Sequence, residues 1–478
     1  MISSESPSHE YRTGPDGPKG HWFYGHLAEL RDDILGFFSR CERDYGGLVR
    51  LRLYHEPFYL VCDPDLIQRI LVTDHRKFVK PTGLQVVKPM FGEGLLTSDG
   101  DLWRKQRDLM QPSFHRECIR RYASIAVEST EKLLASFAAN QERDIHVDMS
   151  GLTLDIVARS LFGADVTAGR AVIAAGADGV QAFFNSWRQR YLPPLPEWLP
   201  LPALRRLKRT VRELDAMIDL LVSSRQASRE RSDDLLSMLL HSRYSDGSPM
   251  SRRQLRDELV TLFLAGHDTT ASSLSWAWYL LSQHDVVFAT LCAELDRVLG
   301  GARVTLDDLP KLSYLDRVFK EVLRLYPSAY NIGRVAKESC EVGGHHIARG
   351  RNLIMCQWAV QRSARHYQDP EAFRPERWDP NAVKKPAKFA YFPFGGGPRN
   401  CIGAQFATME AKLILATLAQ RWRLELASGR KIAVDPALTL RPLGGLPMIV
   451  RRREPVLRKG PPPSSGGGAR SHVAASNV

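Results

Sequence analysis

The chain has 478 residues, of which 44% are hydrophobic and 25% are charged, a composition typical of a globular protein with a large core. Its net charge is +13, but the basic residues are scattered and no nucleic-acid-binding motif is present, so we expect no nucleic-acid partner. Seven cysteines without a C-x-x-C pair argue against a disulfide framework and against a structural zinc site.

The N-terminal segment is polar and lacks the apolar stretch of a signal peptide. No run of about 18 apolar residues is present, so no membrane-spanning helix is predicted. We therefore expect a cytoplasmic protein. Because residues 14–20 are rich in Gly and Pro, we expect a flexible segment over 1–20, followed by one folded domain over 21–454.

The first predicted elements are a helix near 28–45 and a hairpin of strands 48–54 and 58–62. Short strands are expected again over 335–355 and at the end of the folded chain. The tail 455–478 is rich in Pro, Gly and Ser and is predicted to be disordered. Helical patterns dominate between these regions, which makes the fold mainly α with minor β. The predicted helices are 102–112, 118–138, 150–162, 203–226, 252–283, 287–299, 313–325 and 402–423.

The strongest motif is F-x-x-G-x-R-x-C-x-G, which runs from Phe394 through Arg399 and Cys401 to Gly403. Its glycines allow the backbone to approach a flat ligand closely. The N–H groups of the helix that follows favour an anion, so we expect Cys401 to be a thiolate. A phosphate-binding loop is the rival interpretation, but neither Gly-Lys-Ser/Thr nor G-x-G-x-x-G is present.

A second motif, AGHDTT at 265–270, lies inside the predicted helix 252–283. Gly266, Asp268 and Thr269 are poor helix formers, and such a conflict within a strong helix indicates function. Gly266 is expected to open the helix over a flat cofactor, and the Thr269 hydroxyl to bond back to a carbonyl. The alternative is the polar face of an exposed helix, which the apolar flanking residues argue against.

These two segments resemble the haem-binding loop and the oxygen-activation segment of the cytochrome P-450 superfamily, and the resemblance extends over about residues 20–452. It implies a single-domain helical bundle around a buried haem b, with small β-sheets. Cys401 would be the metal ligand, and a thiolate on haem iron favours cleavage of the O–O bond. Phe394, Gly403, Ala265 and Gly266 would contact the haem.

Two further segments match the family. Glu321 and Arg324 resemble its E-x-x-R, and FRPERW at 373–378 resembles the segment that supplies a second arginine, here Arg377. The resemblance implies a buried cluster of these three residues beneath the haem. The spacing by itself is weak support, because exposed helices carry many such pairs.

The haem propionates would be held by four residues. Trp103 and Arg107 are spaced i,i+4 and therefore share a helix face. Arg334 and Arg399 match two further propionate positions of the family. For Arg107 and Arg334, a solvated surface position is the alternative.

The resemblance implies a haem-thiolate monooxygenase (an EC 1.14 type of oxidoreductase) that inserts one atom of O2 into a lipophilic substrate by hydroxylation or epoxidation. Asp268 and Thr269 would guide protons to the oxygen. A fatty acid or a terpenoid is the expected substrate, because the residues at the family's pocket positions are largely apolar. These are Phe91, Leu95, Leu96, Phe183, Phe184, Leu262 and Ile332, within segments 86–96, 183–187, 262–269 and 328–332.

No reductase is fused to the chain, so we expect electrons from a ferredoxin or flavodoxin with its NAD(P)H reductase. An acidic electron carrier would bind to a basic face of the protein. We expect a monomer, and we leave open a peripheral membrane contact through 193–202. The expected face comprises Arg104, Lys105, Arg116, Arg120, Arg121 and residues 384–388.

Three other functions remain as alternatives. A haem-thiolate isomerase or dehydratase would need no external electrons, and a peroxygenase would use peroxide. The acid–threonine pair Asp268–Thr269 disfavours both. A haem-based gas sensor would need a signalling domain, and none is visible in the sequence.

Overall fold

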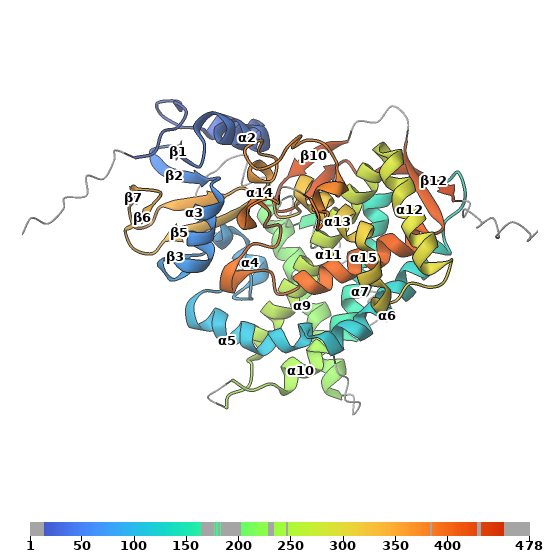
Figure 1. Ribbon diagram of the computed structural model, residues 1–478. Coiled ribbons are helices and arrows are strands. Elements are labelled where there is room, and N and C mark those ends of the chain that lie inside the picture. Colours follow the sequence, from blue (N-terminus) through green and yellow to red (C-terminus); the bar gives the residue numbers. More distant parts are fainter. Residues whose placement is uncertain are drawn as a thin grey trace, which may run out of the picture.

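The computed structural model describes residues 14–163, 176, 178, 179, 182, 202–227, 234–244, 247–382, 385–427 and 432–453. The helices gather on one side of the molecule and the largest sheet on the other (Figure 1). The helices are α1 (Leu27–Asp32), α2 (Ile34–Tyr45), α3 (Pro64–Gln68), α4 (Lys88–Phe91), α5 (Gly100–Met110), α6 (Arg116–Leu134), α7 (Ile145–Phe162), α9 (Pro202–Ala227), α10 (Leu235–His241), α11 (Arg252–Gln283), α12 (Asp285–Leu299), α13 (Ser313–Leu325), α14 (Gln357–Val360) and α15 (Ala404–Ala419).

The strands form small sheets. The largest has the order β1-β2-β8-β5-β3, in which only β2 and β8 run parallel. A three-stranded sheet has the order β4-β12-β9, and β10-β11 and β6-β7 are separate hairpins. The strands are β1 (Leu48–Leu53), β2 (Glu56–Val61), β3 (Phe78–Val79), β4 (Glu142–Asp144), β5 (Ile332–Ala336), β6 (Cys340–Val342), β7 (His345–Ile347), β8 (Asn352–Met355), β9 (Trp422–Leu426), β10 (Ala433–Pro436), β11 (Leu440–Leu443) and β12 (Pro447–Arg452).

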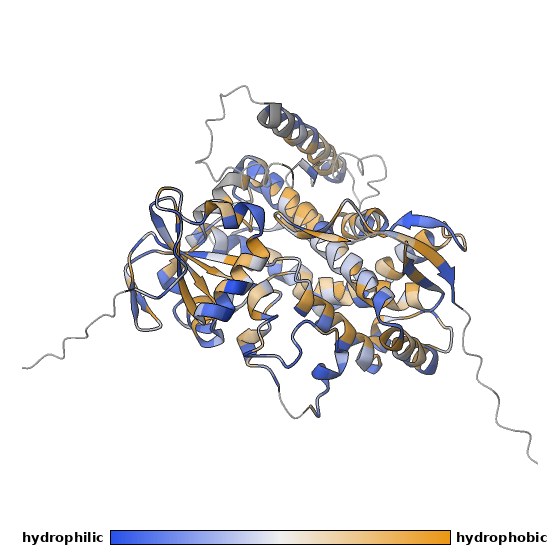
Figure 2. Cartoon of the chain, turned by 90° about the horizontal axis from the view of Figure 1, so that it is seen from above, coloured by the Kyte–Doolittle hydropathy of each residue, from blue (hydrophilic) through white to orange (hydrophobic). Residues whose placement is uncertain are grey.

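Helix α11 runs through the larger of the two hydrophobic cores, and most of its side chains are buried. It packs on α7, where the rings of Phe162 and Phe263 stack with centroids 4.1 Å apart. The Thr153 hydroxyl of α7 donates to the carbonyl of His267 at 3.0 Å. In Figure 2 hydrophobic residues are frequent on the helices in the middle of the molecule, and hydrophilic residues are more frequent toward the periphery. The motif AGHDTT is thus held in the middle of a packed scaffold.

The mainly α fold with minor β is confirmed, and α11 and α13 have the predicted bounds. The helix expected over 28–45 is instead two helices. They break at Asp33, whose backbone is not helical (φ −153°, ψ 70°) and whose carboxylate accepts a hydrogen bond from the Gly36 N–H at the start of α2. The predicted hairpin is confirmed as β1–β2, with Leu53 paired to Glu56.

Residues 14–20, expected to be flexible, are tied to β1. The Arg50 N–H donates to the carbonyl of Asp16 at 3.0 Å, and the His26 ring lies 3.0 Å from the carbonyl of Pro18. Three parts of the chain lie outside the described residues: 1–13 of the expected flexible segment, 193–201 and the tail 455–478. Within the described part of the chain, no helix is both long and apolar enough to span a bilayer.

Candidate functional site

Cys401 stands on a tightly folded loop before α15. Gly395 and Gly397 have φ angles of +74° and +68°, which side-chain-bearing residues rarely adopt. The Cys401 N–H donates to the carbonyl of Phe394 at 2.9 Å, so the loop turns back on itself. A side chain at Gly397 would collide with the carbonyl of Leu71. The loop therefore holds the cysteine in one position.

Cys401 as a residue is exposed to solvent. Burial raises the pKa of its thiol, against the lowering effects of the Gly403 N–H and of Arg107. The loss of hydration thus opposes the N-terminus of α15, and the expected thiolate stays a prediction. A bound metal ion would displace the proton, as metal binding to cysteine does.

Arg107 contacts this loop through two hydrogen bonds. Its two terminal nitrogens donate to the backbone carbonyl and to the side-chain oxygen of Asn400, each at 2.8 Å. The guanidinium therefore braces the residue next to Cys401. Each terminal nitrogen carries a second N–H group, so the expected contact of Arg107 with a haem propionate stays a prediction.

One face of α11 is open to solvent in the middle of the helix. Ala265 is exposed and Thr269, one turn later, is partly exposed, whereas most neighbouring positions are buried. The Thr269 hydroxyl donates to the carbonyl of Ala265 at 2.8 Å, which confirms the predicted back-bond. Gly266 differs from expectation, because its missing side chain would point at Val157 of α7, 3.2 Å away. This glycine permits close helix packing, and its expected contact with a cofactor stays a prediction.

Asp268 is buried and turned toward the hairpin β10–β11. Its carboxylate forms an ion pair with Arg441 and accepts a 2.6 Å hydrogen bond from the Thr439 hydroxyl. Both partners lie more than 170 residues downstream, and no sequence motif linked them to Asp268. The structure thus brings the motif's acid together with a cation that sequence reasoning missed.

A group of cations lies where α5, β5 and the Cys401 loop meet. Arg399 pairs with Asp99 and stacks over Trp103, with 4.2 Å between its guanidinium carbon and the ring centroid. Arg334 is buried and donates to the carbonyl of Gly333. Burial and the neighbouring Arg399 lower the pKa of Arg334 to about 10.

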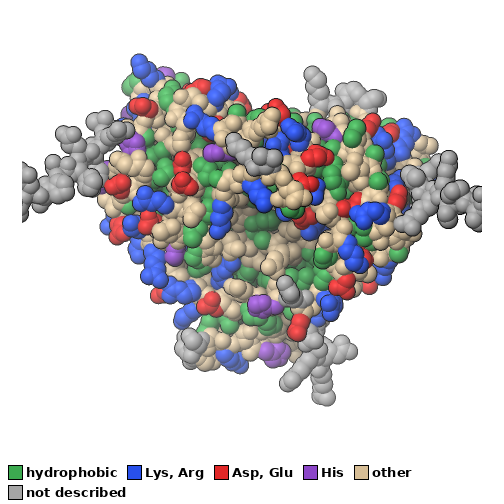
Figure 3. All heavy atoms as spheres, viewed as in Figure 1, with side chains coloured by type: hydrophobic (Ala, Val, Ile, Leu, Met, Phe, Trp, Pro, Cys, Tyr) green, Lys and Arg blue, Asp and Glu red, His purple; other side chains and the backbone are tan. Residues whose placement is uncertain are grey.

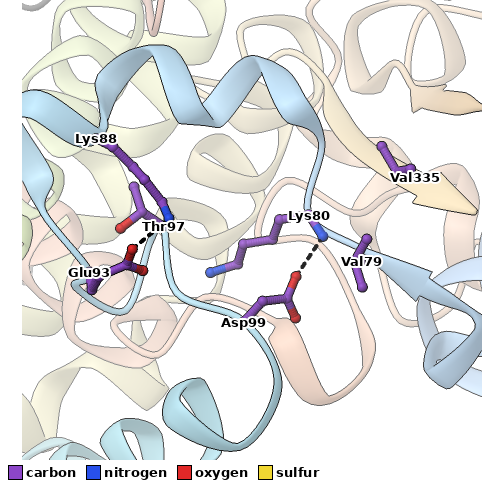
Figure 4. A pocket seen from close by; sticks show the side chains of 7 residues that line it. All are labelled: Val79, Lys80, Lys88, Glu93, Thr97, Asp99 and Val335. Carbon is purple, nitrogen blue, oxygen red and sulfur yellow. Dashed lines mark hydrogen bonds and ion pairs between the residues drawn. The ribbon is translucent and has the colours of Figure 1, made fainter. Parts of the chain in front are cut away.

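Lys80 belongs to the same group and was missed by sequence reasoning. Its ammonium group donates to the carbonyl of Leu95 at 2.7 Å. Burial, followed by repulsion from Arg399, lowers its pKa to about 7. Figure 4 shows the Lys80 side chain crossing a pocket beside Asp99. The pocket has a volume of about 430 Å³ and is lined by Val79, Lys80, Lys88, Glu93, Thr97, Asp99 and Val335.

The group formed by Lys80, Arg334 and Arg399 carries more positive than negative charge, and protein surrounds much of it. Arg334, Arg399 and Lys80 act on one another as like charges, and Asp99 is the carboxylate that compensates them most directly. One terminal nitrogen of Arg399 is buried and has no partner among the described residues. Buried cations require counter-anions. The two propionates of a haem would supply them, so the residues present fit that group.

Glu321 and the arginines of the predicted cluster do come together. Arg324 lies fully buried against Glu321, and the Nε of Arg377 donates to the same carboxylate at 2.7 Å. Trp378 adds an indole N–H at 2.7 Å. The two terminal nitrogens of Arg324 also donate to the carbonyls of Gln361, Pro370 and Ala372. The predicted cluster is confirmed, and it anchors the segment that leads to the Cys401 loop.

Gln361 extends this anchoring and was not predicted. Its side-chain N–H donates to the carbonyls of Leu323 and Arg324, while its oxygen accepts from the Phe392 N–H at 3.0 Å. Helix α13 is thus tied to the start of the cysteine loop.

The expected apolar pocket residues divide into three groups. Phe91 and Leu262 are buried, with 2% and 7% of their surface exposed. Leu95, Leu96 and Ile332 are partly buried. Phe183 and Phe184 lie outside the described residues. Figure 3 shows a hollow in the centre of one face, with hydrophobic side chains in its wall.

Comparison with known proteins agrees with this geometry. The family model for cytochrome P-450 matches residues 15–445. Cyclooctatin synthase of Streptomyces melanosporofaciens is 35% identical, covering 92% of this chain and 96% of that protein. Pentalenene oxygenase of Streptomyces avermitilis is 33% identical, covering 88% of this chain and 91% of that protein. Cyclooctat-9-en-7-ol 5-monooxygenase of S. melanosporofaciens is 33% identical, covering 94% of this chain and 98% of that protein. The chain therefore belongs to the cytochrome P-450 family.

Proposed function

We propose that the protein is a monooxygenase that inserts one atom of O2 into a terpenoid, by hydroxylation or epoxidation. Two solvent-exposed positions carry this proposal: Cys401 on its loop and the Ala265–Thr269 face in the middle of the otherwise buried helix α11. Similarity to proteins named for oxidising pentalenene and cyclooctat-9-en-7-ol favours a terpenoid over the fatty acid that we also considered.

Haem b is the cofactor we propose. The chain has no C-x-x-C-H motif for covalent haem attachment, which favours the non-covalent form. Cys401 would be the iron ligand. The propionates would be held by Lys80, Trp103, Arg107, Arg334 and Arg399. When bound, the haem supplies the oxygen-activating chemistry, and the thiolate ligand favours O–O cleavage.

The residues of α11 would manage protons and water. Thr269 presents its hydroxyl on the open face while it remains bonded to Ala265, so it can hold a water or pass on a proton. Asp268 is the nearest acid in sequence, and we assign it the supply of protons to this hydroxyl. The apolar residues nearby, including Leu262, would exclude bulk water and receive a lipophilic substrate.

We further propose that electrons arrive from a ferredoxin or flavodoxin with its NAD(P)H reductase. Arg104 and Arg120 keep 69% and 75% of their side chains exposed and could meet an acidic carrier. Each already has an acidic neighbour, Asp101 or Asp307, so their contribution would be modest. The side chains of Arg116 and Lys384, also expected on this face, are outside the described residues. We retain the expectation of a monomer.

The decisive experiment begins with the reduced, carbon-monoxide-treated protein. A thiolate-ligated haem gives a red-shifted absorption band, and an imidazole-type spectrum would contradict the proposal. A panel of terpene hydrocarbons and alcohols, with fatty acids as the comparison, is then scored for spin-state shifts and products. NADH with ferredoxin and reductase should support turnover. Turnover with peroxide alone would identify a peroxygenase. Rearrangement of a substrate without NADH and without added peroxide as oxidant would identify an isomerase.

A further inference from the structure

The backbone of Leu95 is held from both sides by side chains that can carry opposite charges. Its N–H donates to the carboxylate of Glu258 in α11 at 2.9 Å. Its carbonyl accepts from the Lys80 ammonium group, in the segment after β3, at 2.7 Å. Glu258 has no exposure to solvent. Two residues from distant parts of the chain therefore fix the backbone of one residue.

The backbone before Leu95 is bound to the same end of α11. The Gln254 side chain donates to the carbonyl of Glu93 at 3.1 Å and to the second carboxylate oxygen of Glu258 at 2.8 Å. The Glu93 N–H donates to the Asp257 carboxylate at 2.8 Å. A side chain at Gly94 would collide with α11. The segment 93–96, called the wall segment below, therefore lies directly against the first turns of this helix.

Glu258 lies on the same side of α11 as the open face. Positions 258, 262, 265 and 269 recur every three or four residues, so they share one face of the helix. Ala265 and Thr269 are the solvent-accessible members of this row. Leu95 and Leu96, which are partly buried, are thus carried by a backbone that is bound two turns before Ala265. The wall segment therefore borders the N-terminal end of the open face.

The charge of Glu258 strengthens its contact with Leu95 and does not stabilise the fold. Burial raises the pKa of Glu258 to about 7, and Asp257 raises it further, against the lowering effects of the Leu95 N–H, Gln254 and Lys80. A buried carboxylate is costly, whereas a neutral side chain of the same shape would avoid that cost. A charged acceptor, however, binds a backbone N–H about twice as strongly as a neutral one.

We propose that Glu258 is a positioning residue that, together with Lys80, fixes the wall segment against α11 and thereby limits how bulky a substrate the site accepts. The proposal rests on the proposed function, because it requires a haem and a substrate beside the open face. Glu258 itself touches neither. Without its carboxylate the Leu95 N–H loses its acceptor, so the wall segment can move away from α11 and make room for a bulkier ligand.

The test uses two small ligands of haem iron. The haem-loaded, reduced protein is titrated with methyl isocyanide and with tert-butyl isocyanide, which are uncharged and differ in bulk. The ratio of their dissociation constants measures the room beside the wall segment. For Glu258→Leu we expect this ratio to shift about tenfold in favour of tert-butyl isocyanide, because a hydrogen bond to a charged group is lost. Glu258→Gln keeps an acceptor and should shift the ratio less.

The pH dependence of this ratio separates positioning from a general loss of structure. Because the pKa of Glu258 lies at about 7, its ionisation between about pH 6 and about pH 8 should increase the preference of the wild type for methyl isocyanide. The other charged groups that act on Glu258 are Asp257 and Lys80, and the propionates would keep Lys80 charged over this range. Glu258→Gln should show no such increase.

Melting temperature gives a second independent measurement. Glu258→Gln removes a buried charge, so at about pH 8 it should melt at the same or a higher temperature than the wild type. Glu294→Gln is the matched control. Glu294 is also buried and accepts the backbone N–H groups of Tyr314 and Leu315, but it binds the start of α13 and not the wall segment. It should leave the ratio of the two dissociation constants unchanged.

A second variant keeps the test decisive if Glu258→Leu does not fold. Gln254→Leu removes the donor to both Glu258 and the wall segment and should shift the ratio in the same direction, by a smaller factor. An unchanged ratio in the Glu258 and Gln254 variants, or a shift in favour of methyl isocyanide, would overturn the role of Glu258. An imidazole-type carbon-monoxide spectrum of the wild type would instead contradict the proposed function, because Cys401 would not be the ligand.

Discussion

Glu321 and Arg324 form a two-pronged ion pair with no exposure to solvent: Nε lies 2.9 Å from one carboxylate oxygen and Nη2 2.8 Å from the other. Burying two charges is costly, and the cost is offset here by the further donors and acceptors around them. The carboxylate also receives the Arg374 backbone N–H at 3.0 Å. The pair is therefore the centre of a network that holds the segment before the cysteine loop.

Removal of either partner should prevent assembly of the loop. We expect Glu321→Ala or Arg324→Ala to cost about 3–5 kcal/mol in the free energy of unfolding, because the remaining charge is left uncompensated. Purified protein should contain little haem, measured as haem per polypeptide. Lys320→Ala removes an exposed pair with Asp316 on the same helix and serves as the control. Normal haem content in both Glu321 and Arg324 variants would show that the cluster does not support the loop.

Cys401→Ser should abolish monooxygenation even where haem is retained. A serine hydroxyl is a much weaker ligand for iron than a thiolate, and it cannot donate electron density to the same extent. The carbon-monoxide complex should lose its red-shifted band. Cys340→Ser, at a partly exposed cysteine of β6, should keep both the band and the activity. Retention of the band in the Cys401 variant would place the ligand elsewhere.

Lys80→Met should weaken haem binding without unfolding the protein. The substitution removes a buried cation from a group with excess positive charge, so the haem-free protein should melt at the same or a higher temperature. Haem titration of the apoprotein should show roughly tenfold weaker binding, since a charged hydrogen bond contributes about 1.5–3 kcal/mol. Lys88→Met removes the partly exposed partner of Glu93 on the other side of the pocket and is the matched control. Equal haem affinity in both variants would remove Lys80 from the propionate site.

The sequence predicted those features that lie within one element or one loop. The helix containing AGHDTT and the back-bond of Thr269 follow from local spacing, and both are present. The cluster of Glu321, Arg324 and Arg377 joins distant segments and followed from the resemblance to the family. Lys80 and Arg441 reach the site from distant segments, and no periodicity links them to it.

The pKa of the Cys401 thiol shows the same limit of sequence reasoning. The N-terminus of α15 is visible in the sequence, whereas the loss of hydration that raises the pKa depends on the whole tertiary structure. The same applies to Gly266, whose role is set by Val157 of a helix more than 100 residues upstream. Pairwise packing between distant helices leaves no local signature.

Thr269→Ala should uncouple electron consumption from product formation while haem and substrate binding persist. The hydroxyl lies on the open face of α11, and its loss removes both a donor and the bond to Ala265. Water would then enter with less control, and reduced oxygen would leave as peroxide. With a terpene identified from the panel, NADH consumption should continue, but product formed per NADH should fall several-fold and peroxide should rise. Spin-state titration should give an unchanged dissociation constant.

Thr269→Ser is the informative control for this variant, because it keeps the hydroxyl and removes only a methyl group. We expect it to retain most of the coupling. Asp268→Asn should behave differently, with slower O2 consumption and less change in coupling, because it reduces the supply of protons and leaves the Thr269 hydroxyl in place. If Thr269→Ala and Asp268→Asn both keep the wild-type rate and coupling with a confirmed substrate, the polar pair has no part in oxygen activation. An isomerase or dehydratase would then explain the site better, because such an enzyme requires neither external electrons nor delivered protons.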